Sequence, residues 1–354
     1  MNTKRAAKRS HRKLRVLVIA HESVVPPDDV SGLSETEIDP FRMEYNVIST
    51  LISLGHEVRV IGILDSLSAL REAARDWRPH VVFNLLDEFS GIASYDHYVV
   101  VYLELMRQAY TGCNPRGMMV SRDKVLTKQV LAAHRIATPS FRVFPYGKRF
   151  REPRKPVFPL FVKSATEDAS LSISQASVVQ DMASLRERVE FIHDHVESDA
   201  LVEEYIDGRE LYIGLLGNTR LTTLPVWEMD FGDLTQAQAG IATRKVKWDR
   251  NYQKHHGIDT GPAKSLEPEL QARLNRLARR IYRALHMSGY ARLDLRMRND
   301  GKVFLLEANA NPDLTYGEDF AESAHAAGFD YETLISKIVS LGRSYMPEWR
   351  MFEP

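Results

Sequence analysis

The feature that most constrains this chain is a pair of apolar-alternating segments joined by Asn-Asp-Gly. Residues 289–298 read GYARLDLRMR and residues 302–310 read KVFLLEANA, and each alternates like a strand with one buried face. Asp-Gly is a strong signal for a two-residue type I′ turn, because both central positions need positive φ. The sequence therefore predicts a β-hairpin that turns at Asp300 and Gly301.

This turn fixes which side chains share a face of the predicted hairpin. Asp294 lies opposite Glu307, and Arg292 lies opposite Asn309. The other face is filled by Leu293, Leu295, Leu306 and Ala308. Opposed carboxylates repel unless a cation lies between them, and oxygen ligands favour a hard ion such as Mg²⁺ bound with phosphates. The alternative is a solvated face with arginine salt bridges, which the apolar run before Glu307 disfavours.

The first part of the chain alternates strand-like and helical patterns. Strand-like runs at 14–20, 57–64 and 80–86 are interleaved with helical spacing at 41–54, 67–77 and 95–107. Strands that alternate with helices pair in parallel through crossover helices. We therefore expect an α/β domain with a parallel sheet over 14–112.

The remainder mixes strands and helices less regularly. We expect a small α+β domain over 113–206, with a helix that Ser121 caps and that runs to His134. A third domain over 207–354 contains the hairpin and a long helix at 268–286. A length of 354 residues is sufficient for three domains.

Charge is unevenly distributed although 47 basic residues balance 47 acidic ones. The total does not indicate a general nucleic-acid binder. Residues 1–13 contain six basic and no acidic side chains, which leaves a slightly acidic remainder, and we expect a disordered basic tail there. This tail is either a solvated leader or a contact for RNA, membrane or an acidic partner.

Cys113 is the single cysteine of the sequence. An internal disulfide and a thiolate metal cluster are therefore excluded, and a reducing cytoplasm is the expected location. No stretch approaches the roughly 20 apolar residues that a membrane span requires.

Several motifs together resemble the ATP-grasp superfamily, and most closely its D-alanine–D-alanine ligases. The hairpin run continues to Thr315 as an Arg-x-Asp strand, a Leu-Glu-x-Asn strand and a proline. In chain order it is preceded by YTG (110–112), SRDK (121–124), IATPSF (136–141), FPLFVKSA (158–165) and LVEEYIDGREL (201–211). The resemblance implies a three-domain ATP-grasp fold, α/β with α+β character in the middle and C-terminal parts.

Site residues follow from the resemblance position by position. The family's lysines that contact the ATP phosphates are matched by Lys124, Lys163 and Lys247. The family's segment that hydrogen-bonds the adenine edge is matched by Glu203 and the backbone of Ile206. The ribose-binding acid is matched by Glu210, for which a surface ion pair with Arg209 is the alternative. The metal ligands are matched by Asp294, Glu307 and Asn309, and the catalytic arginine by Arg292.

The implied reaction is ATP-dependent amide formation from a small-molecule carboxylate and an amine. An acyl phosphate forms, the amine attacks it, and positive groups with Mg²⁺, or Mn²⁺ in its place, stabilise the transferring phosphoryl group. Nucleic acid is not an expected substrate, and a homodimer is left open.

Other positions depart from the D-alanine–D-alanine ligase pattern. The loop 166–174 lacks the family's glycines, residues 83–98 replace its His-Gly segment, and Trp248 replaces its tyrosine. Its glutamate could be Glu22 or Glu37. We therefore expect a substrate pair other than two D-alanines, with candidate contacts at Asn84, Asp87, Glu88, Tyr95, His97 and Asp313.

Three alternatives remain at the level of function. A genuine D-alanine–D-alanine ligase is the first, and a non-catalytic ATP-binding scaffold that uses the basic tail is the second. Carboxyphosphate-type carboxylation is the third, and the hairpin motif disfavours it. The retained Arg292, Asp294, Glu307 and Asn309 argue against a loss of chemistry.

Overall fold

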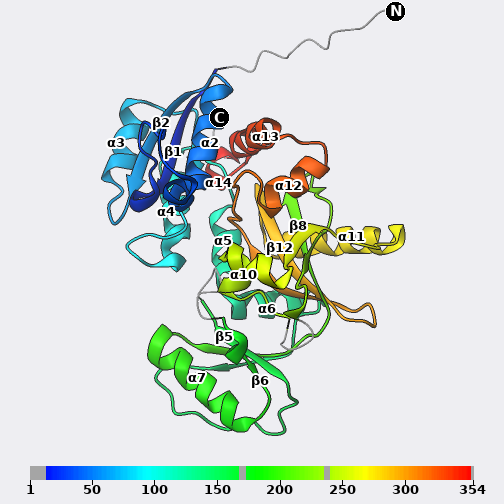
Figure 1. Ribbon diagram of the computed structural model, residues 1–354. Coiled ribbons are helices and arrows are strands. Elements are labelled where there is room, and N and C mark those ends of the chain that lie inside the picture. The colour runs from blue at the N-terminus through cyan, green and yellow to red at the C-terminus, as the bar shows by residue number, and fades with distance from the viewer. Residues whose placement is uncertain (1–12, 167–172, 235–239, 352–354) are drawn as a thin grey trace, which may run out of the picture.

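The computed structural model describes residues 13–166, 173–234 and 240–351 (Figure 1). Within these residues the strands form a parallel sheet near the N-terminus, an antiparallel sheet in the middle of the chain and a larger antiparallel sheet in its last part. In Figure 1 the larger sheet lies between the other two. The predicted tail and most of the predicted loop 166–174 lie outside the described residues.

The parallel sheet has the strand order β2-β1-β3, as the alternating sequence predicts. Its core strand β1 is almost entirely apolar, because helices cover a parallel sheet on both faces. The elements are β1 (Arg15–His21), η1 (Glu22–Val24), α1 (Glu35–Ile38), η2 (Asp39–Phe41), α2 (Arg42–Ser53), β2 (Glu57–Ile63), α3 (Ser68–Asp76), β3 (Val81–Asn84), η3 (Ala93–Tyr95) and α4 (Asp96–Leu105).

The middle sheet has the order β4-β7-β5-β6 and is covered by the amphipathic helix α7. Its elements are β4 (Phe141–Phe144), β5 (Leu160–Ser164), η4 (Gln175–Ser177), β6 (Val178–Val179), α7 (Met182–Val196) and β7 (Ala200–Glu204). They are preceded by two helices, α5 (Pro115–Arg122) and α6 (Lys124–Ala133).

The predicted single helix from Ser121 to His134 is wrong. The chain breaks at Asp123, whose carboxylate accepts hydrogen bonds from the backbone N–H groups of Val125 and Leu126. Asp123 is thus the N-cap of α6, and an aspartate caps more effectively than a serine that is already inside a helix. Lys124 becomes the first residue of α6 as a result.

The larger sheet has the order β11-β10-β8-β12-β13, and β9 pairs with β8. The elements are β8 (Arg209–Leu216), β9 (Thr222–Thr223), β10 (Trp227–Asp230), α9 (Arg244–Trp248), α10 (Arg250–His256), β11 (Asp259–Pro262), α11 (Pro268–Ala284), β12 (Tyr290–Met297), β13 (Val303–Asn309), α12 (Asp319–Ala326), α13 (Tyr331–Ser344) and α14 (Glu348–Met351).

The end of the chain returns to its beginning. Helix α13 packs against α2 and β3, and Leu334, Ile335 and Ile338 share a core with Val16 and Val47. Figure 1 shows α13 beside the N-terminal sheet. The first and last parts of the chain therefore share buried apolar surface, which holds their loops in fixed relation.

None of the helices in the described segments has the length and apolar character needed to cross a lipid bilayer.

Candidate active site

The hairpin of β12 and β13 brings the predicted polar residues together. Asp294 pairs with Glu307 and Arg292 pairs with Asn309, which confirms the predicted register. The predicted two-residue turn is wrong, however. The N–H of Arg298 donates to the carbonyl of Lys302 at 3.0 Å, so three residues form the loop.

A β-bulge restores the register between turn and site. Leu295 pairs with Leu305, whereas Asp294 pairs with Glu307, so Leu306 is an extra residue on β13. The bulge turns Leu306 towards the pocket that Glu307 also lines, whereas Leu293, Leu295 and Ala308 lie in the core. The predicted core position of Leu306 is therefore wrong.

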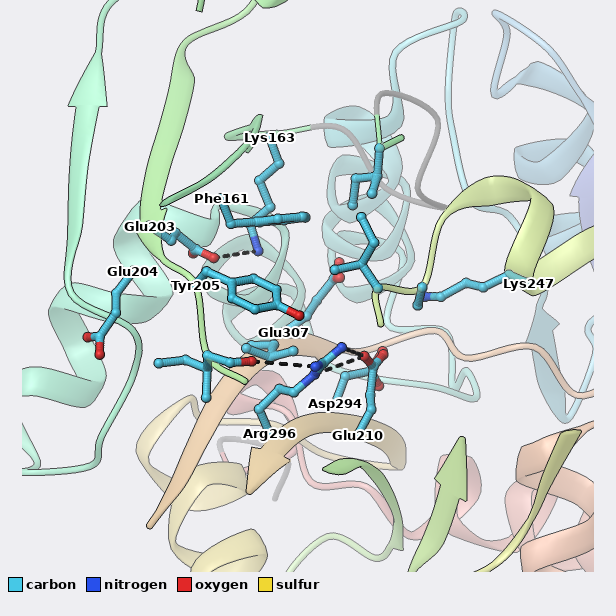
Figure 2. Close-up of a pocket in the computed structure, with 15 residues that line it drawn as sticks. Phe161, Lys163, Glu203, Glu204, Tyr205, Glu210, Lys247, Asp294, Arg296 and Glu307 are labelled. Atoms are coloured by element: carbon cyan, nitrogen blue, oxygen red, sulfur yellow. Dashed lines mark hydrogen bonds and ion pairs between the residues drawn. The ribbon is translucent and has the colours of Figure 1, made fainter. Parts of the chain in front are cut away.

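The first pocket lies between the middle sheet and the hairpin and has a volume of about 610 Å³ (Figure 2). Apolar and charged side chains alternate on its wall. The lining residues are Phe161, Lys163, Ile173, Glu203, Glu204, Tyr205, Ile206, Glu210, Ile241, Ala242, Lys247, Asp294, Arg296, Leu306 and Glu307.

A buried ion cluster forms one wall of this first pocket. The Glu203 carboxylate lies 2.8 Å from the Lys128 ammonium and 3.2 Å from the Lys163 ammonium. Burial opposes ionisation of Glu203, but the two ammonium groups outweigh it and lower the pKa of Glu203. Glu204 points the other way and is far more exposed, as expected for adjacent strand residues.

A second buried pair supports the opposite wall. Glu210 accepts hydrogen bonds from Arg296 at 2.6 Å and 3.1 Å and from the Tyr212 hydroxyl at 2.9 Å. The alternative pairing of Glu210 with Arg209 is wrong, since Arg209 binds Glu228 instead.

The Arg296 guanidinium also ties this wall to the turn between β7 and β8. It donates to the backbone oxygens of Ile206 and Gly208. Gly208 has φ 145°, and a Cβ there would lie 2.2 Å from the carbonyl oxygen of Met297. A side chain at this position would therefore push β12 away from the turn.

The hairpin face itself carries ion pairs. Arg292 donates to both oxygens of Asp294, at 2.8 Å and 3.0 Å, and the Lys124 ammonium lies 3.5 Å from Glu307. The face therefore has the arginine salt bridge of the alternative interpretation, but it is not a solvated surface, because Asp294 is 4% exposed. Burial opposes the charge of Arg292, yet Asp294 raises the pKa of Arg292 above its usual value.

Glu307 stays ionised in this setting. Burial raises its pKa, but neighbouring positive groups outweigh burial and hold the pKa well below the usual range. These groups belong to Lys124, Lys163, Lys247 and Arg292. An ionised carboxylate is the form that binds a metal ion.

A second, larger pocket of about 2550 Å³ opens on the other side of Glu307. Glu307 and Lys247 line both pockets, so the two join at these side chains. Arg292 and Asn309 line the second pocket, as do Asp87, Glu88 and Asp313 among the predicted substrate contacts.

Three other predicted contacts lie elsewhere. Asn84 is buried and accepts a hydrogen bond from the backbone of Leu86, His97 contacts the backbone of Ser94, and Tyr95 packs on Tyr98. None of the three lines the second pocket.

Sequence reasoning missed three charged residues of the site: Lys128, Arg296 and Glu44. Lys128 is four residues after Lys124, so helical spacing places both on one face. Arg296 is two residues after Asp294, so strand alternation places it on the same face. Glu44 lines the second pocket from α2, whereas neither Glu22 nor Glu37 does, and no local pattern predicted this.

Comparison with known proteins places this arrangement in a family. A family model described as "D-ala D-ala ligase C-terminus" matches residues 132–340. A D-alanine–D-alanine ligase of Nitratidesulfovibrio vulgaris is 30% identical, over 82% of this chain and 89% of that protein. This chain belongs to the D-alanine–D-alanine ligase family. The sequence prediction of this family is thereby confirmed.

This D-alanine–D-alanine ligase family member is also similar to a second protein in sequence and to a solved structure in fold. An uncharacterised protein of Sinorhizobium fredii, y4sG, is 32% identical over 85% of this chain and 87% of that protein. The crystal structure of a Bacillus anthracis D-alanine–D-alanine ligase complexed with ATP superposes with a TM-score of 0.71 and 22% identity, covering 93% of this chain and 97% of that one. The ATP-grasp fold is confirmed, and the chain is an ATP-dependent ligase of this type.

Proposed function

We propose that this ligase joins a carboxylate to an amine through an acyl phosphate, and that its substrate pair is not two molecules of D-alanine. One observation carries the proposal: Glu307 lies where the two pockets meet, opposite Asp294 and near Lys124. A reacting phosphoryl group at this junction would reach a nucleotide on one side and a carboxylate on the other. Positioning and charge stabilisation are what phosphoryl transfer requires.

The first pocket is the proposed nucleotide site. Lys163 and Lys247 on its wall, and Lys124 beside Glu307, supply positive charge for the phosphates. Glu203, Ile206 and Glu210 also line this pocket. We place the lid of this site in residues 113–206 and its floor in residues 207–354, with the first substrate-binding loops in residues 14–112.

Oxygen atoms of Asp294, Glu307 and Asn309 are the proposed ligands of Mg²⁺. The described residues contain no cluster of three or more His, Cys, Asp or Glu side chains that could hold a metal ion alone. The donor set therefore fits an ion completed by nucleotide phosphates and water, which is how Mg²⁺ is usually bound. When bound, Mg²⁺ would neutralise charge on the transferring phosphoryl group.

The proposed chemistry proceeds in two steps. A carboxylate oxygen attacks the γ-phosphorus of ATP, and ADP leaves with the electrons of the broken bond. The amine nitrogen then attacks the acyl carbon, phosphate leaves, and the nitrogen loses its proton. Arg292, held by both Asp294 oxygens, presents a fixed positive charge to the phosphoryl and tetrahedral species.

The departure from D-alanine rests on the second pocket. The family's His-Gly segment is replaced along residues 83–98, and the two acids of this replacement that line the wall, Asp87 and Glu88, do so together with Asp313. A genuine D-alanine–D-alanine ligase remains the competing proposal.

Phosphate release tests the proposal. Wild-type protein with ATP, Mg²⁺ and pooled amino acids should release phosphate, and D-alanine alone should not support substantial release. Glu307→Gln should lower the rate by about a hundredfold or more, because it removes a charge at the transferring group.

Asp300→Asn is the matched control, because it removes an acid at the exposed tip of the same hairpin. It should leave turnover unchanged. Full activity of Glu307→Gln would overturn the metal assignment, and rapid turnover of D-alanine would overturn the substrate assignment. No phosphate release with any mixture would favour a nucleotide-binding scaffold.

A further inference from the structure

The second pocket has a buried carboxylate that lacks a counter-charge. Glu44, on α2, is 4% exposed and lines the pocket. Apart from its own backbone N–H, it has no hydrogen bond or ion pair in the part of the chain that the structure describes. A buried carboxylate without a counter-charge is unfavourable unless it is protonated or meets a cation.

Two further acids face Glu44 across the pocket. Asp87 follows β3 and Asp313 follows β13, so three distant segments contribute one carboxylate each. Asp313 is held in place because one of its oxygens accepts hydrogen bonds from the backbone N–H and hydroxyl of Thr315, at 2.7 Å and 2.6 Å. Burial, and then the charges of Asp87 and Asp313, raise the pKa of Glu44 to about 7.

The basic side chains on the same wall are mostly engaged with other acids. Each of four basic side chains binds a carboxylate outside the trio. The pairs are Arg42 with Asp39, Arg122 with Asp96, His21 with Glu88, and Arg292 with Asp294. Lys247 is the remaining basic group of the pocket wall, and it acts on Glu307 and Asp319 rather than on Glu44.

We propose that Glu44, Asp87 and Asp313 bind an ammonium group of the amine substrate, and that this substrate carries net positive charge. This inference deepens the proposed function and rests on it, because the proposed function is what makes the bound amine a substrate. An ammonium group can donate three hydrogen bonds, one to each carboxylate. A substrate without net positive charge would leave part of the negative charge of this trio uncompensated.

A resident metal ion fits less well than an ammonium group. The trio does not form a metal-binding cluster, and the described residues contain none elsewhere. Ammonium hydrogen bonds tolerate longer spacing between acceptors than direct metal coordination does.

Three four-carbon amines separate the possibilities: putrescine with two ammonium groups, butylamine with one, and γ-aminobutyrate with no net charge. Binding is measured by calorimetry on the full chain with Mg²⁺ and a non-hydrolysable ATP analogue, at about pH 8, where Glu44 is ionised. Putrescine should bind about tenfold more tightly than butylamine, because its second ammonium group compensates more of the negative charge of the trio, and γ-aminobutyrate should bind more weakly than either.

Glu44→Gln should remove this preference for putrescine, because the amide keeps the shape of the side chain and loses its charge. Asp39→Asn is the control: it removes one acid from the same pocket, but an acid already paired with Arg42. The control should keep the preference.

Equal affinities for putrescine and butylamine would overturn the inference, as would an unchanged preference in Glu44→Gln or an equal loss in Asp39→Asn. The unfolding midpoint of each variant excludes a folding defect. Because binding is measured without turnover, a Glu44-dependent preference together with no phosphate release for any substrate would refute the proposed function and leave the binding site intact.

Discussion

The two pockets that meet at Glu307 differ in whether their buried acids are paired with cations of the protein. In the first, buried acids are matched by cations of the protein itself: Glu203 with two lysines, and Glu210 with Arg296. In the second, Glu44 is buried beside other acids, with no cation paired to it among the described residues. The first wall is organised before a ligand binds, whereas the second is balanced only when a cation enters.

The strongest test of this contrast removes Glu203. Glu203→Gln should lower the free energy of unfolding by about 3–5 kcal/mol, because it leaves Lys128 and Lys163 buried close to each other without a counter-charge. Urea denaturation monitored by circular dichroism measures the change.

Glu204→Gln is the matched control, because Glu204 is the next residue and its carboxylate forms a loose surface ion pair, 4.0 Å from the Arg298 guanidinium. It should change stability by less than about 0.5 kcal/mol. Similar losses for the two variants would mean that the Glu203 cluster contributes no more than a surface pair.

The second pocket should show its unbalanced charge as a pH dependence. The pKa of Glu44 is raised in the folded protein from 4.5 to about 7, so the folded state binds more protons than the unfolded state between these values. Stability is therefore lost as the pH rises through this window. Relative to Glu44→Gln, the wild type should lose on the order of 2 kcal/mol.

Urea denaturation of both proteins across this pH window measures the difference. Parallel stability curves for wild type and Glu44→Gln would show that Glu44 titrates normally. Adding putrescine should reduce the loss above about pH 7, because the ligand favours the ionised carboxylate.

The smallest effect on stability is expected at the border of the two pockets. Lys247 makes no direct ion pair within the described segments, so Lys247→Ala should change the free energy of unfolding by less than about 0.5 kcal/mol. It should still weaken ATP binding by about tenfold, because a charge-assisted contact to phosphate is lost. Calorimetric titration with ATP checks this, and a large loss of stability would contradict it.

The hairpin was predictable because local rules determine it. Period-two alternation placed Asp294 and Glu307 on one face, and their predicted pairing holds because the three-residue turn and the bulge offset each other. The parallel sheet followed from alternating strands and helices. The three-residue turn and the bulge at Leu306 were not predicted, because Asp-Gly is compatible with more than one turn and the bulge depends on neighbouring strands.

The remainder of the site depends on distant contacts. No pattern in the sequence around Glu44 predicts its burial, because that burial results from the packing of α2 near the loops that follow β3 and β13. Glu203 was predicted as a pocket residue, but its two lysine partners come from α6 and β5. The pairing with Lys163 requires β5 to lie beside β7 in the middle sheet, and the pairing with Lys128 requires α6 to pack against that sheet.

The turn and the bulge of the hairpin shift the pairing by one residue in opposite directions, so that their effects cancel at Asp294 and Glu307. A homologue with a two-residue turn must therefore also lack the extra residue at Leu306 if its two acids are to stay opposite each other. In a sequence alignment, the insertion in the turn and the insertion in the strand would be inherited together. Separating them would move the acid of β13 to the wrong face of the sheet.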